Sequence, residues 1–320
     1  MTAAASSPLP LEGPHGPLSR LGRGIDRFFF DPTTPTALGL LRVVFFGFVL
    51  AFFWTHDFSD WATVPRGSFR PVWIFRRFGW KVAPKETIEL LQWVWTGALL
   101  FATVGLLTPL AIAVSLGIGV YLFGLPSSFG KIGHGDACLL IVMGFFLFSR
   151  CFDALSIDLL LLRRLFGYRP PARSGEYRWP IRLGQVMLAI IFCGSGISKL
   201  LYSGLAWATS DHLQILLMQH RYGLKDPPWP AAATFLAERP ALCKLFAAGS
   251  LALEVLFPLA LFSRWLRAPI VLGALSMQIG IGLMLGIYFW QFLLLYIFYI
   301  PWTRWLGGDG LRTEAPSVNG

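Results

Sequence analysis

Residues 181–201 read IRLGQVMLAIIFCGSGISKLL, an apolar stretch that is long enough to cross a bilayer as a single helix. Lys199 lies near the end of this stretch. Ionisable residues inside membrane-spanning segments are energetically costly, so they usually mark a functional site. Two interpretations of Lys199 are open. Its side chain extends to the lipid headgroups from the helix end, or it lies in a dry pocket where desolvation favours a neutral amine that can act as a base.

The composition of the whole chain is that of a membrane protein. Hydrophobic residues make up 55% of the 320 residues and charged residues only 14%, whereas soluble domains carry about 25% charged residues. The formal net charge of +10 comes mostly from Lys and Arg in loops beside the apolar stretches. We interpret this charge as contact with anionic lipid and predict no nucleic-acid partner. The four cysteines lack the close spacing of a zinc site, so we predict no metal.

Apolar stretches recur along the chain and predict an all-α, polytopic integral membrane protein with about eight transmembrane or re-entrant helices. They cover residues 37–54, 88–107, 109–124, 137–149, 181–201, 241–262, 268–286 and 288–302. Several are short for a lone span, so we expect tilted or re-entrant helices among them. Residues 23–305 are predicted to form the membrane domain, between a disordered tail at 1–22 and a flexible tail at 306–320.

The distribution of arginines favours an orientation with both termini in the cytoplasm, because cytoplasmic loops carry an excess of basic residues. Residues 28–30 are then expected in the membrane interface, with Arg23 and Arg27 reaching lipid phosphates. The same orientation brings Lys199 toward the outer face. Other polar residues expected at that face, where they could line one water-accessible cavity, are Lys131, His134, Asp136, Asp211, His212 and His220.

Two further charges, Arg42 and Glu254, lie inside apolar stretches. Charges in such places usually have partners, so we predict a structural ion pair between them. The many tryptophans fall near the expected membrane boundaries. Amphipathic rings gather at these boundaries, and we therefore interpret the tryptophans as interfacial anchors rather than as a quinone-stacking set.

Two local patterns each raise the question of a catalytic or a structural role. His134-Gly135-Asp136 opens an apolar stretch and forms either a proton relay or a helix cap supplied by Asp136. Ser198 directly precedes Lys199. Adjacent helix positions point about 100° apart, which argues against a serine–lysine hydrolase.

Several short motifs occur in a recognisable order along the chain. They are Phe30-Asp31-Pro32, LGLLR at 38–42, GKIGHG at 130–135, LSID at 155–158, GISKL at 196–200 with Gly204 and Trp207, and Glu254 with Pro258. In this order and spacing they resemble the horizontally transferred transmembrane (HTTM) domain. That domain is the membrane part of vitamin K-dependent gamma-carboxylases and of many bacterial proteins without assigned activity. The resemblance covers roughly residues 25–305.

The resemblance implies that Lys199, in its Gly-x-x-Lys-Leu element, is the base that deprotonates reduced vitamin K before a glutamyl side chain is carboxylated. It implies a further site residue at Asp153, which stands where the carboxylases have a histidine and which the family pattern places near Lys199. Gln278 falls near the position of a second histidine, in the penultimate helix. Since the chain ends soon after its last apolar stretch, we expect no extramembrane substrate domain.

We therefore expect a gamma-carboxylase-like protein of the bacterial cytoplasmic membrane that uses a reduced quinone, with a protein or peptide substrate approaching from the outer face. The expected catalytic residues are Lys199, His134 and Asp153, and the expected pocket residues are Lys131, Asp136, Trp207, His212 and Gln278. The alternative is a non-enzymatic membrane protein that binds or moves a lipid or quinone. Convergence of these polar side chains around the Lys199 ammonium would favour the enzyme.

Overall fold

The protein is all-α, as predicted, in a computed structural model that describes residues 17–130, 133–224 and 226–302. Within those ranges the extended backbone forms only an isolated bridge between Thr33 and Ser174. Lys131, residues 1–16 and the predicted C-terminal tail lie outside the described residues. The α-helices are α1 (Pro17–Phe30), α2 (Pro35–Phe53), α3 (Trp73–Phe78), α4 (Lys85–Val104), α5 (Thr108–Ser128), α6 (His134–Leu147), α7 (Ile157–Phe166), α8 (Trp179–Ser203), α9 (Ala206–Thr209), α10 (His212–Met218), α11 (Pro230–Ala237), α12 (Pro240–Leu256), α13 (Leu259–Phe262), α14 (Arg264–Leu285) and α15 (Trp290–Leu295).

Short 3-10 helices connect several of these elements. They are η1 (Ser59–Ala62), η2 (Arg66–Ser68), η3 (Cys151–Asp153), η4 (Gly175–Tyr177), η5 (Gln219–Tyr222) and η6 (Tyr296–Tyr299). The last of them continues α15, so that the two form one apolar segment, Trp290–Tyr299.

Five helices of the described chain are long and apolar enough to cross a membrane: α2, α4, α5, α8 with the preceding 3-10 turn, and α14. Three other predicted spans correspond to shorter helices. α6 has 14 residues, which gives a length of about 21 Å against a hydrocarbon core of about 30 Å. α12 has 17 residues, and the segment formed by α15 and η6 is shorter still.

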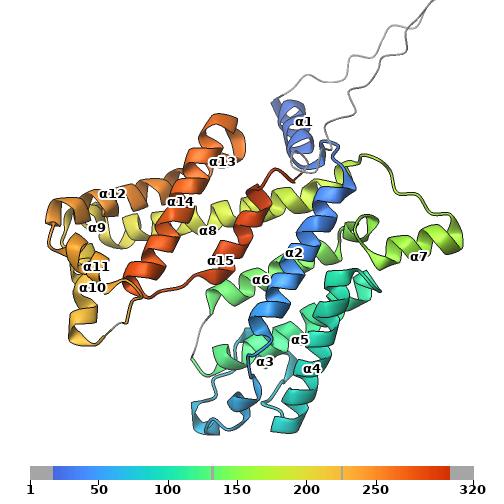
Figure 1. Cartoon of the computed structure of the whole chain (residues 1–320), viewed down its shortest axis with the longest axis horizontal. Helices are drawn as coiled ribbons and strands as arrows, with labels where there is room; N and C mark the ends of the chain where they lie inside the picture. The colour runs from blue at the N-terminus through green and yellow to red at the C-terminus, as the bar shows by residue number, and fades with distance from the viewer. Residues whose placement is uncertain (1–16, 131–132, 225, 303–320) are drawn as a thin grey trace, which may run out of the picture.

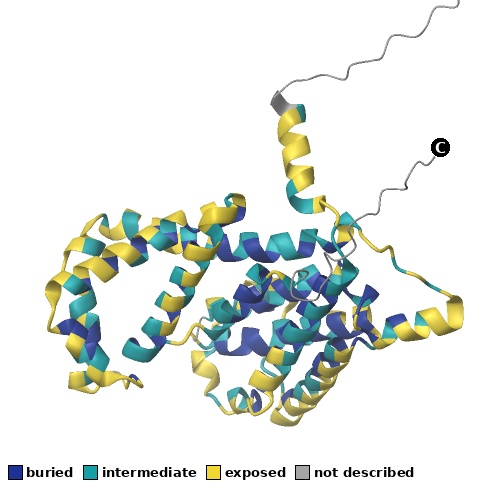
Figure 2. Cartoon of the chain, turned by 45° about the horizontal axis from the view of Figure 1, so that its top comes forward, coloured by how far each residue is buried: buried dark blue, intermediate teal, exposed yellow. Residues whose placement is uncertain are grey.

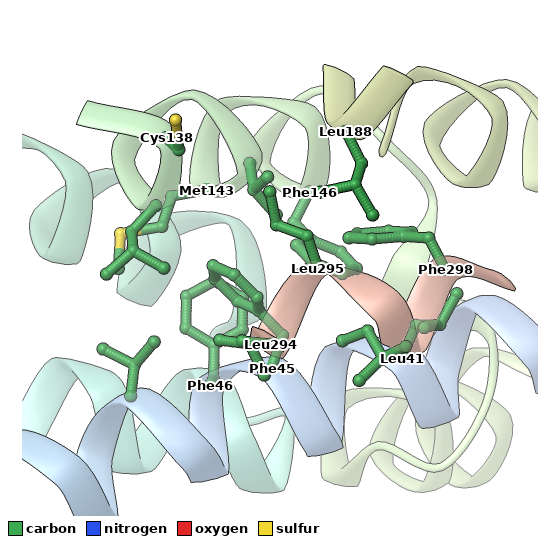
Figure 3. Close-up of a cluster of buried hydrophobic side chains, with 14 of the residues drawn as sticks. Leu41, Phe45, Phe46, Cys138, Met143, Phe146, Leu188, Leu294, Leu295 and Phe298 are labelled. Carbon is green, nitrogen blue, oxygen red and sulfur yellow. The ribbon is translucent and has the colours of Figure 1, made fainter. Parts of the chain in front are cut away.

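The helices form two groups that α8 joins (Figure 1). α2, α4, α5 and α6 pack together, whereas α12 packs against the C-terminal part of α8 and against α14. The main core lies where α2, α6, α8 and α15 meet, and Figure 3 shows its side chains interdigitating. It includes Leu41, Phe45, Phe46, Met143, Phe146, Leu188, Leu294, Leu295 and Phe298. A second, smaller cluster of buried residues comprises Leu217, Ala233, Leu236, Ala237, Cys243 and Leu285.

α1 begins at Pro17, so its first six residues fall within the segment that was predicted to be a disordered tail. Leu21 and Ile25 are four residues apart, and Phe28 and Phe29 follow on the same face. Arg20, Arg23 and Arg27 lie on the opposite face. This spacing is that of an amphipathic helix.

Candidate ligand-binding site

Lys199 lies at the edge of an apolar cavity of about 480 Å³ between α12 and α14. α10 and α11 close the cavity on one side, and the ends of α8 and α9 close another. Most of the wall is made of aliphatic and aromatic side chains: Leu213, Leu216, Leu245, Phe246, Leu253, Ile281 and Met284. The charged or polar-tipped side chains that line it include Lys199, Trp207, His212 and Glu254. The cavity is therefore mostly apolar, with one ionic corner.

These four side chains form a continuous series of contacts. The ammonium Nζ of Lys199 lies 2.5 Å from Glu254 Oε1 and 4.6 Å from the centroid of the Trp207 ring. The Trp207 and His212 ring centroids are 4.6 Å apart. The exposed fraction of the side chain is 21% for Lys199 and 6% for Glu254. The ammonium is thus held by a carboxylate on one side and by an aromatic ring on another.

A close approach of α8 and α12 brings the two charges together. Gly196 lies three residues before Lys199, and a Cβ at this position would stand 2.8 Å from Val255 Cγ2 and 3.0 Å from Glu254 Cβ. Only a residue without a side chain lets the helices pack this tightly. Gly204 ends α8 with a positive φ of 57°, after which the chain enters α9 and presents Trp207.

The second carboxylate oxygen of Glu254, Oε2, is buried and makes no hydrogen bond. Ser195, on the preceding turn of α8, interacts with the same carboxyl group but does not satisfy this oxygen. A buried acceptor without a donor is unfavourable, and a ligand hydroxyl could supply the missing donor. The corner can therefore accept a hydrogen bond at Oε2 and stabilise negative charge at Lys199 Nζ.

The predicted ion pair between Arg42 and Glu254 is wrong. Arg42 is fully buried on α2 and donates a hydrogen bond to the backbone oxygen of Leu155. The reason is helix packing: α2 packs against η3, whereas α12 packs against α8. Lys199, not Arg42, is the cation that faces Glu254.

Asp153 belongs to a different cluster. Its carboxylate accepts hydrogen bonds from Tyr168 at 2.7 Å and Tyr177 at 2.8 Å, and it pairs with Arg150 at 2.9 Å. Tyr177 directly precedes α8, and Lys199 lies near the other end of that helix, about 30 Å away along its axis. The expectation that Asp153 lies near Lys199 is therefore wrong, and Asp153 joins the loops on either side of α7 instead.

His134 and Asp136 line a second cavity, of about 960 Å³, between α5, α6 and residues 67–74. Asp136 Oδ1 accepts a hydrogen bond from Gln291 Nε2 at 2.8 Å, so this carboxylate links α6 to α15. Neither residue lines the Lys199 cavity. Gln278 is buried on α14 and does not line it either, although its neighbour Met277 does. Of the polar residues predicted for one pocket, the described structure brings together Lys199, Trp207 and His212.

Glu254 belongs to the site but was not predicted there, because Arg42 was the predicted partner of its carboxylate. The signal was present, since Glu254 is an acidic residue inside an apolar stretch and Lys199 is a basic one. The apolar walls from α10 and α14 had no comparable signal, since leucines occur in most of the helices.

Fold and site together define a class: an all-helical protein whose described residues include five candidate membrane spans and an apolar cavity that ends at a half-buried ion pair. Comparison of the chain with protein-family models, with curated proteins and with solved structures gives no match. The resemblance to the HTTM domain accordingly stays a prediction based on the motifs quoted above.

Proposed function

We propose that this chain is a multi-pass integral membrane protein, in which α6, α12 and the α15–η6 segment add three short or re-entrant helices to the five candidate spans. Short helices are tolerated at membrane depth where neighbouring helices cover them. α6 packs against α5 and α15, and α12 packs against α8 and α14, so each has such cover. We also propose that both termini lie in the cytoplasm and that the protein is located in the bacterial cytoplasmic membrane.

We further propose that the Lys199 cavity binds an amphipathic molecule of the quinol or lipid class. The observation that carries this proposal is the contrast within the cavity, which has long aliphatic walls and one ionic corner. A volume of about 480 Å³ falls in the range of about 300–1,000 Å³ that is common for small-molecule sites. The apolar part of the ligand would lie between α12 and α14, and its polar head would contact Lys199 and Glu254.

Binding of a naphthoquinone tests this proposal. Quinones quench tryptophan fluorescence at short range, so titration of the purified protein should give saturable quenching. Trp207→Phe should remove part of that quenching and weaken binding, because Trp207 lines the cavity. The matched control is Trp73→Phe, since Trp73 is exposed on α3 and does not line the cavity. Equal quenching in wild type and both variants would contradict binding at this site.

A second candidate function is carboxylase-like chemistry with a reduced quinone such as vitamin K hydroquinone and Lys199 as the base. The observation that favours it is the hydrogen bond between Lys199 Nζ and Glu254 Oε1. Along this bond the ammonium can pass a proton to the carboxylate, which leaves a neutral amine able to accept a proton from a bound hydroxyl. A lysine that stays paired and charged instead serves to hold an anionic head, as the binding function requires.

Substitutions at Lys199 separate these two roles once a ligand or activity has been identified. Lys199→Arg keeps the charge but cannot act as a base near neutral pH, because a guanidinium does not give up its proton. If Lys199 is the base, Lys199→Arg should lose turnover about as fully as Lys199→Ala while ligand binding is retained. Full turnover in the arginine variant would end the general-base proposal and leave the binding proposal intact.

A further inference from the structure

α1 carries an apolar surface that nothing in the described chain covers. The exposed fractions of Leu21 and Ile25 are 62% and 49%, although both lie on the apolar face of an amphipathic helix. The C-terminal end of α1 is held in place, because Arg182 Nε donates to the backbone oxygen of Phe28 at 3.1 Å and Asp31 pairs with Arg178 at 3.0 Å. α1 is therefore anchored at its C-terminal end and projects from the helix bundle, and its apolar face is exposed (Figure 2).

α7 shows the same combination of features. Its exposed residues include Leu160, Leu165 and Phe166, with exposed fractions of 64%, 68% and 77%, and two consecutive arginines, Arg163 and Arg164, lie between them. In Figure 2 the helix extends away from the bundle at the right. Isolated exposed leucines are ordinary, but a contiguous group of this kind marks a surface that contacts another apolar phase.

The position of α7 is fixed at both ends. Ser156 caps its first turn by accepting a hydrogen bond from Leu159 N at 3.0 Å. Asp158 accepts hydrogen bonds from Leu107 N at 2.8 Å and Thr108 N at 2.7 Å, which ties α7 to the start of α5. Just beyond its C-terminal end, Tyr168 donates to Asp153. α7 is thus a rigid projection rather than a free segment.

Both helices lie at the same end of the bundle, where α2 and α8 begin. The bridge between Thr33 and Ser174 joins the segment after α1 to the loop after α7, and Arg173 donates to the backbone oxygen of Pro32. In Figure 1, α1 lies at the top and α7 at the right, whereas α9–α11 lie at the left and α3 at the bottom. A single plane can therefore touch α1 and α7 without touching α3 or the Lys199 end of α8.

The charge on this surface is strongly positive. α1 has three arginines and one acidic residue, Asp26. α7 has two arginines, and its one acidic residue, Asp158, is engaged with α5. At the opposite end, Lys85 pairs with Glu89 and directly precedes Glu86, although residues 66–81 there carry five basic residues and no acidic one. Exposed apolar side chains interspersed with arginines match the boundary between lipid phosphates and acyl chains.

We propose that α1 and α7 lie in the headgroup layer of one leaflet and bind anionic phospholipids through their arginines. Leu21, Ile25, Leu160 and Leu165 enter the upper acyl region, while Arg163 and Arg164 contact phosphates. Because cytoplasmic leaflets are anionic and cytoplasmic segments are basic, this is the cytoplasmic leaflet. The Lys199 corner then opens toward the opposite side. This inference rests on the proposed membrane insertion but not on the proposed ligand.

The test uses the full chain in lipid nanodiscs, with a single environment-sensitive fluorophore attached at Leu165→Cys in a background without the four native cysteines. Neutral phosphatidylcholine discs are compared with discs that contain phosphatidylglycerol. We expect a blue-shifted emission that becomes stronger as the anionic fraction rises. The same label at Ile25→Cys tests α1 and serves if the first variant does not fold.

Arginine variants then test the role of charge, and α3 supplies a matched control. Arg76 and Arg77 are consecutive arginines at the end of a short apolar helix that a positive-φ glycine terminates, just as Arg163 and Arg164 are in α7. Arg163→Gln/Arg164→Gln should weaken the response to anionic lipid by about five-fold for each arginine. Arg76→Gln/Arg77→Gln should leave the response unchanged.

Three outcomes would overturn the proposal. An emission typical of water in both lipids would show that the surface lies outside the bilayer. A blue shift that is independent of anionic lipid and of either arginine pair would show apolar contact without recognition of anionic lipid. A blue shift in detergent that grows with protein concentration would indicate that a second copy of the chain covers the surface. Failure of naphthoquinone binding would leave this proposal standing, because the ligand plays no part in it.

Discussion

The Lys199–Glu254 pair should be strongly coupled in stability, and a double-mutant cycle measures this directly. Removing one partner of a buried ion pair costs about 3–5 kcal/mol, because the other charge stays buried without compensation. Glu254 has a side-chain exposure of only 6%, whereas that of Lys199 is 21%. Lys199→Leu leaves the Glu254 carboxylate buried without a partner, whereas Glu254→Leu leaves an ammonium that is still in contact with Trp207. Lys199→Leu should therefore lower the free energy of unfolding more than Glu254→Leu.

The double variant Lys199→Leu/Glu254→Leu carries neither charge, so it should recover most of the lost stability. We expect a coupling free energy of at least about 2 kcal/mol. Lowering the pH should also reduce the defect of Lys199→Leu alone, since a protonated Glu254 is neutral and less costly to bury. Wild type should show no such gain from this carboxyl group, because its ion pair is lost when the carboxylate is protonated.

Unfolding of the purified protein in mixed micelles, followed by circular dichroism during titration with sodium dodecyl sulfate, gives the four free energies of the cycle. The exposed pair Lys85–Glu89, with a separation of 3.9 Å and exposures near 47%, is the control. Its cycle should give a coupling of at most about 0.5 kcal/mol. Additive effects of Lys199→Leu and Glu254→Leu would refute the reasoning that the two charges depend on one another.

Three further predictions concern the packing around α2 and α5. Gly39→Ala would place a Cβ 2.5 Å from a facing backbone oxygen, so we expect a loss of about 1–3 kcal/mol in the same titration. Gly97→Ala, with open space around it in the interior of α4, should cause no loss and should stabilise the helix by up to about 1 kcal/mol. Arg42→Leu should lower folded yield, and Glu254→Leu should not rescue it, since the two residues have different partners; rescue would restore the rejected pair. Asp158→Ala removes two hydrogen bonds from the start of α5, so hydrogen–deuterium exchange at residues 105–110 should accelerate. Unchanged exchange there would show that this carboxylate contributes little to the stability of the α5 N-terminus.

The long helices could be predicted from the sequence because a continuous apolar run of about 20 residues is typical of a helix that can cross a membrane. α2, α8 and α14 match their predicted stretches within a few residues. The predicted span at 241–262 is instead interrupted near Pro258, where α12 ends at Leu256 and α13 begins at Leu259. Proline lacks the backbone donor that a continuous helix needs, so this break was readable from the sequence.

The ionic corner of the cavity could be predicted from the sequence in part. Lys199, Trp207 and His212 follow one another closely along the chain, so local geometry brings them together. Which cation pairs with Glu254 depends on which helix packs against α12. The pattern of apolar residues along the sequence does not contain that information. Gly196 decides it by allowing α8 and α12 to touch. The placement of Asp153 required knowing that the length of α8 separates it from Lys199.

The two-part core has a consequence for how a ligand reaches the cavity. α10 and α11 form a cavity wall that rests on the smaller cluster of buried residues and is tied together by the Gln214–Ala237 and His220–Thr234 hydrogen bonds. Because its buried residues form a cluster separate from the core around α2, α6 and α15, we expect this wall to open locally at a lower free energy than global unfolding, which hydrogen–deuterium exchange would measure. Leu245 and Phe246 on α12 also line the cavity and are 65% and 57% exposed, so the site is already open at its side to a hydrophobic guest. Opening of the α10–α11 wall would widen this entrance, and a larger guest would depend on that opening.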